Sequence, residues 1–238
     1  SQSTLKMSLS GITTLRISGH ANIKVRTIST HSYVSSNLVT VKYRKKKRAS
    51  VKLNVHPTDA SALLLQASPL SSSSSSSYSS NVASTGITLT VYLPSSQQQQ
   101  HSTTAGYAYN MTIVMIDGSV DFHAPNTALR LQSLTVHTNR GDITLNGIES
   151  KTVINATTDY GYVSMSHTSS PDGNVFIHCP RGTIHFSNVS AHSLTITDVK
   201  SIESSGRISI TSDIVIDSSG GGDNDSDGSE NSGGNGGG

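Results

Sequence analysis

The second half of the chain repeats one short pattern, a glycine, then any residue, then valine or isoleucine. Each occurrence opens a run in which apolar and polar residues alternate, and such a run reads as a short strand. Successive glycines of the series are about 20 to 24 residues apart. The glycines of this series are Gly118, Gly141, Gly161, Gly182 and Gly206.

A second alternating run lies between each pair of these glycines, as at 133–138 and 193–198. A repeat of about 20 residues with two or more short strands is typical of a β-solenoid, whose coils bury a thin core only by stacking. We therefore predict an all-β solenoid with coils of about 20 to 24 residues, and glycine at corners that need a positive φ. An antiparallel β-sandwich is the alternative, because it also has short strands at regular spacing.

The composition fits a thin core. Hydrophobic residues make up 33% of the 238 residues, there is no tryptophan, and the chain holds 45 serines and 25 threonines against 13% charged residues. Cys179 is the only cysteine, which excludes an intramolecular disulfide framework; on a predicted strand it is expected to be a buried, inert thiol.

Composition divides the chain into four parts. Residues 1–67 read as N-terminal β coils, in which 38–55 looks like a hairpin with a basic tip. Residues 68–105 are predicted to be low-complexity serine and glutamine insertions around a strand at 86–94. Residues 106–217 hold the solenoid repeats, and residues 218–238 are predicted to be a disordered Gly/Ser/Asp tail.

Four stretches carry a family resemblance: LRISGHANIKV, ITLTVYLP, SLTVHTNRGDITLNGI and NVFIHCPRGTIHF. They resemble the putative adhesin family, a group of β-solenoid domains of unknown function often compared with autotransporter adhesin heads. The resemblance implies a right-handed, single-stranded β-helix, a surface or adhesive role, and an extracellular or cell-surface location. The family has no agreed catalytic residues, so the resemblance assigns none.

Residues 140–142 spell Arg-Gly-Asp, the tripeptide that cell-adhesion proteins present to integrins. Gly141 stands where the other coils also have glycine, and the residue after it varies from coil to coil. The repeat itself therefore explains the tripeptide, and integrin-type recognition is not expected.

The basic tract at 42–48 is the strongest local charge in the chain. Its cations are suited to bind phosphate, a polyanionic glycan or an acidic membrane surface. The tract also has the composition of a nuclear localisation signal. The simpler reading, which the sequence favours, is a solvated hairpin tip that protects a sheet edge. Only Tyr43 accompanies the tract, so sequence-specific nucleic-acid binding is not expected. The candidate polyanion ligands are Lys42, Arg44, Lys45, Lys46, Lys47 and Arg48.

No catalytic, metal or cofactor site is predicted. The carboxylates that a polysaccharide-cleaving β-helix would need are spread over different coil positions, namely Asp117, Asp121, Asp142, Asp159 and Asp198. Asn110, Asn155 and Asn188 are candidate glycosylation sites, but a chain this rich in serine and threonine holds about as many sequons by chance.

The sequence thus predicts a non-catalytic surface-display protein that acts in adhesion or scaffolding, with an unknown surface glycan or protein as partner. A polysaccharide-acting β-helix enzyme and a polyanion-binding module that uses 42–48 are the alternatives. No run approaches the ~18–20 apolar residues that cross a bilayer, so no membrane span is expected in this segment.

Overall fold

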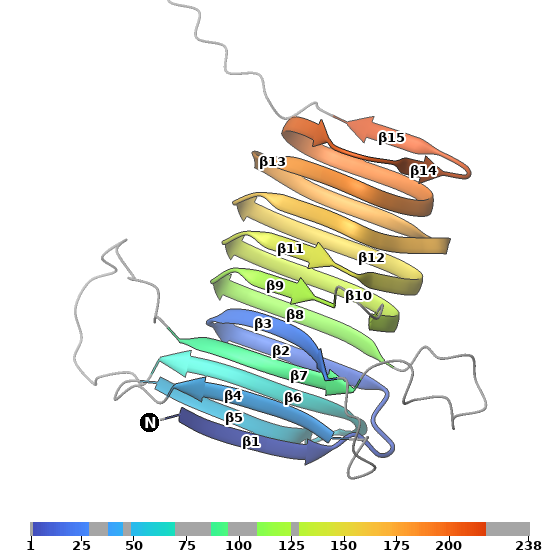
Figure 1. Cartoon of the computed structure of the whole chain (residues 1–238). Helices are drawn as coiled ribbons and strands as arrows, with labels where there is room; N and C mark the ends of the chain where they lie inside the picture. Colours follow the sequence, from blue (N-terminus) through green and yellow to red (C-terminus); the bar gives the residue numbers. More distant parts are fainter. Residues whose placement is uncertain are drawn as a thin grey trace, which may run out of the picture.

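The computed structural model describes residues 2–28, 38–44, 49–69, 87–94, 109–124 and 129–217, which form one stack of strands (Figure 1). The N-terminus and β15 lie at opposite ends of this stack. The strands are β1 (Gln2–Ser8), β2 (Thr14–His20), β3 (Asn22–Ile28), β4 (Leu38–Arg44), β5 (Ala49–His56), β6 (Asp59–Pro69), β7 (Thr88–Pro94), β8 (Asn110–Asp117), β9 (Val120–His123), β10 (Leu129–Arg140), β11 (Ile143–Asn146), β12 (Ile148–Tyr160), β13 (Val163–Ser204), β14 (Ile208–Ile210) and β15 (Ile214–Asp217).

Strand pairing defines two faces of the stack. The first face runs β5, β6, β2, β8, β10 and β12 into β13 and ends at β15. The second face runs β1, β4, β7, β3, β9 and β11 and also enters β13, whose continuous path passes through both faces. From β8 onward every pairing is parallel, as in β8–β10–β12 and β9–β11–β13.

Parallel neighbours that follow one another in the chain require the chain to circle back after each strand. This confirms the all-β, solenoid-like part of the prediction, and it is not the pairing of an antiparallel sandwich. Antiparallel pairs occur only near the N-terminal end of the described stack, in β1–β4, β4–β7 and β5–β6.

The expected hairpin over 38–55 is wrong. β4 pairs with β1 and β7 on the second face, whereas β5 pairs with β6 on the first. The apolar residues of each strand extend a different part of the core: Val39 and Val41 of β4 are buried in the second face, and Leu53 of β5 packs at the end of the first. Residues 45–48 between the two strands lie outside the described residues.

Inward side chains stack in register through the whole first face. Leu134, for example, lies between Met111 one coil earlier and Ile154 one coil later, and all three are buried. The polar residues between them point outward, so a thin apolar core suffices and the serine- and threonine-rich composition is explained.

The glycine corner is shaped by close contact between successive coils. A Cβ on Gly161 would lie 2.2 Å from the carbonyl oxygen of Gly141, and one on Gly182 would lie 1.7 Å from that of Gly161. Gly118 and Gly141 also have positive φ, but Gly161 and Gly182 do not. Glycine is therefore needed at this corner mainly because backbones touch, and only in part for the positive φ that we expected.

Gly206 does not belong to this corner. It packs against Asn188, whose φ is 56°, and the strand after it, β14, pairs with Val189–Ala191. Gly147 with φ 74° and His167 with φ 48° occupy the same, second corner in earlier coils. The step from Gly182 to Gly206, the longest in the glycine series, therefore joins two different corners.

Buried hydroxyl groups complete the glycine corner. Thr138 Oγ1 donates to the Gly118 carbonyl at 3.0 Å, and Thr158 Oγ1 donates to the Gly141 carbonyl at 2.8 Å. Cys179 takes the same position in the next coil, with its Sγ 3.4 Å from the Gly161 carbonyl oxygen. Burial raises the pKa of the Cys179 thiol.

Gly161→Ala is expected to destabilise the protein by about 2 kcal/mol or more, because the new methyl overlaps backbone that cannot move alone. Gly11→Ala is the comparison: Gly11 has φ 76° but open space around it, so only the ~1 kcal/mol cost of a left-handed residue applies. Urea unfolding measures both. Equal losses in the two variants would contradict close contact as the main constraint.

Cys179 is expected to stay unreactive toward Ellman's reagent in the native protein, because the thiol is buried and held largely protonated. Modification should follow unfolding by urea, with no fast phase. Rapid labelling without denaturant would show that this corner opens.

Candidate functional site: a basic face on the second sheet

Outward side chains of four neighbouring strands form two rows across the N-terminal part of the second face. One row contains Lys6, Thr40, Tyr92 and Arg26, and the other contains Thr4, Lys42, Thr90 and Lys24. Cations alternate with threonines in the second row, whereas in the first row Lys6 and Arg26 flank Thr40 and Tyr92. We call Lys6, Lys24, Arg26, Lys42 and Tyr92 the basic face.

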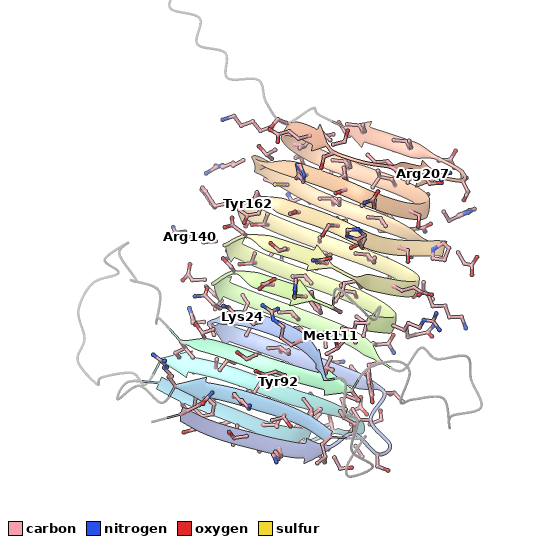
Figure 2. The ribbon with its side chains drawn as sticks, in the orientation of Figure 1. Lys24, Tyr92, Met111, Arg140, Tyr162 and Arg207 are labelled. Atoms are coloured by element: carbon pink, nitrogen blue, oxygen red, sulfur yellow. The ribbon has the colours of Figure 1, made fainter. Side chains whose placement is uncertain are left out.

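Tyr92 is the centre of the basic face. The Lys42 ammonium lies 5.0 Å from the centroid of the Tyr92 ring, a cation–π contact. A shallow depression of about 540 Å³ lies here, lined by Thr4, Lys6, Thr40, Lys42 and Tyr92. Figure 2 labels Tyr92 and, further along the stack toward its C-terminal end, Lys24.

The four cations differ in what they contact. Arg26 donates to Asp121 Oδ2 at 2.6 Å and to the Asp121 carbonyl at 3.0 Å, so its charge is largely neutralised. Among the described residues, Lys6, Lys24 and Lys42 form no ion pair. These three ammonium groups, with threonine hydroxyls between them, are suited to bind anionic groups.

Only part of the predicted basic tract takes part. Lys42 lies in the basic face, Arg44 is exposed at the end of β4 opposite Gln2, and Lys45, Lys46, Lys47 and Arg48 lie outside the described residues. Sequence reasoning missed the rest, because its members lie far apart in the chain. The sequence did contain one sign of the basic face: several strands with alternating apolar and polar residues carry a lysine or arginine at an outward position.

The Arg-Gly-Asp tripeptide is part of the glycine corner. The Arg140 guanidinium lies 5.9 Å from the Tyr160 ring centroid, and Asp142 Oδ1 accepts a hydrogen bond from the Tyr162 backbone N–H at 3.1 Å. Figure 2 shows Arg140 and Tyr162 at one edge of the stack. The aspartate thus joins two coils instead of projecting on a loop.

The candidate glycosylation residues all make hydrogen bonds within the stack. Asn110 Oδ1 accepts from Ser133, Asn155 Oδ1 accepts from Thr157, and Asn188 Oδ1 accepts from the Arg207 backbone N–H. Asn188 is also one of the residues with positive φ at the second corner. Their side chains therefore have structural partners.

The carboxylates stand apart. Asp117 lies 3.5 Å from His20, Asp198 lies 3.4 Å from His178, and Asp121 and Asp142 are engaged as described above. Asp159 is half-buried near the end of β12. In the described part of the chain, no three histidine, cysteine, aspartate or glutamate side chains are grouped to hold a metal ion. No helix there has the length and apolar character to cross a membrane.

The fold and this site define an all-β, β-helix-like protein with a basic outer face. The Toastrack DUF4097 family matches residues 12–219, and the chain belongs to this family. The match includes the four stretches on which the adhesin resemblance rested. It gives no support to the comparison with autotransporter heads.

Two solved structures are similar in outline. One is described as a putative cell adhesion protein from Clostridium sporogenes ATCC 15579, with 10% identity, a TM-score of 0.37, and coverage of 91% of this chain and 98% of that one. The other is described as a putative adhesin from Parabacteroides distasonis ATCC 8503, with 10% identity, a TM-score of 0.32, and coverage of 91% and 97%. A search of the curated proteins found no match.

Proposed function

We propose that this protein is a non-catalytic surface-display protein that acts in adhesion or scaffolding by binding an anionic glycan on its basic face. The observation that carries the proposal is the gathering of Lys6 of β1, Lys24 of β3 and Lys42 of β4 around Tyr92. An extracellular or cell-surface location is part of the proposal, since anionic glycans are found there.

The scaffold proposed for this role is a right-handed coil of about 20 to 24 residues per turn. Val120 pairs with Ile143, and Ile143 pairs with Val163, so the ladder on the second face steps through the chain at that interval. Right-handedness is supported by the general rule that crossovers between parallel strands are right-handed in about 98% of cases. Such a stack holds its outward side chains in fixed rows.

The chemistry of the basic face favours an anionic glycan. Adjacent strands lie about 4.8 Å apart, so Lys42 and Lys24, separated by one strand, stand about 10 Å apart along the stack. Repeated charges along an extended sugar chain can meet repeated ammonium groups on a flat face. Threonine hydroxyls and one aromatic ring between the charges suit sugar hydroxyls and C–H groups.

The absence of catalysis is also a proposal. A glycosidase needs two carboxyl groups about 5 to 9.5 Å apart and facing one bond. Here the carboxylates of Asp121 and Asp142 are engaged with Arg26 and with the Tyr162 backbone N–H, which supports structural roles. Release of new reducing ends or unsaturated uronic acids from an anionic polysaccharide would contradict this part of the proposal.

The triple variant Lys6→Ser/Lys24→Ser/Lys42→Ser is expected to lose heparin binding. Surface ion pairs contribute up to about 1 kcal/mol each, so the loss of three ion pairs with heparin should weaken the binding roughly tenfold or more. Retention on a heparin column at physiological salt, together with the dissociation constant across a salt series, measures the effect.

Lys151→Ser/Lys200→Ser/Arg207→Ser is the matched control, since it removes the same charge from other exposed positions. It should bind heparin like the natural chain. Lys45→Ser/Lys46→Ser/Lys47→Ser tests the basic tract separately. If the Lys6/Lys24/Lys42 variant is retained as before and the tract variant is not, the heparin site lies in the tract. If all three variants lose heparin binding, the binding depends only on net charge.

A further inference from the structure

The C-terminal end of the stack is an open apolar surface. Ile214 and Ile216 continue the inward columns of the first face, directly above Leu194 and Ile196. Leu194 and Ile196 are 4% and 0% exposed, whereas Ile214 and Ile216 are 58% and 54% exposed. The two isoleucines therefore occupy core positions, but no described strand covers them. Solenoid ends normally require a cap with a polar outer face.

The same two columns also end in apolar residues at the N-terminal end. The column of Ile214 begins at Val55, which pairs with Leu63 and is 46% exposed. The column of Ile216 begins at Leu53, which pairs with Leu65 and is half-buried. The stack therefore has two ends that match each other residue by residue, Val55 with Ile214 and Leu53 with Ile216.

Strand direction and charge match as well. β5 and β15 are the last strands of the first face, and no other described strand pairs with their outer edges. β5 runs antiparallel to β6, so β15 of one copy would meet β5 of the next copy as an antiparallel pair. In that register Asp217 of one copy stands in the same outward column as Lys52 of the next.

Residues 218–238 do not offer the missing layer. Residues 218–238 contain glycine, serine, asparagine, aspartate and glutamate, and no apolar side chain. They have nothing to bury against exposed isoleucines. A β-branched edge without proline or lysine, such as 214–217, is the type of edge to which further strands add.

We propose that copies of this chain stack end to end, with β15 of one copy paired to β5 of the next and a continuous apolar core across the junction. The contact joins two different surfaces, so it is heterologous and leaves a free end at each step. The assembly therefore grows into filaments. This inference is independent of the basic face, which lies along the side of the stack.

Two end-blocked variants test the proposal. Val55→Lys places a charge on the N-terminal end, and Ile216→Lys places one on the C-terminal end; both sites are about half exposed, so folding should survive. Sedimentation velocity and electron microscopy of the full chain over a concentration series measure assembly, with circular dichroism to verify folding. Thr135→Lys, an outward position in the middle of the stack, is the matched control.

The natural chain and Thr135→Lys should form filaments of increasing length as the concentration rises. Each blocked variant alone should fail to form filaments, yet an equimolar mixture should form dimers, because one good end remains on each partner. Monomers of the natural chain at all concentrations would overturn the proposal. Dimers of Val55→Lys alone, with Ile216→Lys monomeric, would instead show pairing between two C-terminal ends and would overturn it too.

Discussion

The contact between backbones of successive coils at the glycine corner is the constraint on which the structure depends. The carbonyls of Gly118, Gly141 and Gly161 each occupy the space that a side chain would need in the next coil, and a buried hydroxyl or thiol from that coil donates to each of them. This contact sets the distance between coils at one edge. The β-ladders then propagate the same spacing across both faces.

The fixed spacing between coils gives ordered surfaces even though the repeats differ in sequence. Inward residues need only be apolar and of compatible size, because each packs on its counterpart in the neighbouring coils. Outward residues fall into columns in which chemistry from distant parts of the chain becomes adjacent. The basic face gathers Lys6, Lys24 and Lys42 in this way, and the apolar ends arise where the same columns stop.

The sequence predicted the repeat well where the pattern was local. Alternation and the glycine series indicated the strands and the solenoid-like fold, because Gly118, Gly141, Gly161 and Gly182 stand at the same corner of successive coils. Gly206 was misplaced because two corners carry a glycine before an Ile-containing run, and one-dimensional spacing does not distinguish them. The 38–55 hairpin failed for a related reason, since proximity in sequence does not decide which sheet edge a strand extends.

The candidate site could be predicted only in part, because proximity in sequence does not decide which strands become neighbours in the sheet. Lys42 was found because it belongs to a charge run, whereas Lys6 and Lys24 are single outward residues in otherwise ordinary strands. Their grouping depends on the order of strands across the second face, which mixes antiparallel and parallel pairs. No spacing rule along the chain gives that order.

The in-register stack is the central claim, and distances between spin labels test it most directly. In a Cys179→Ala background, one label at Arg16 is combined with a second at Phe176, Thr195 or Val215, with unlabelled protein in excess. These positions stand four, five and six strands away in one outward column. Distances of about 19, 24 and 29 Å, each narrowly distributed, are expected from a spacing of about 4.8 Å per strand. Distances that fail to grow by about 5 Å at each step would contradict the account.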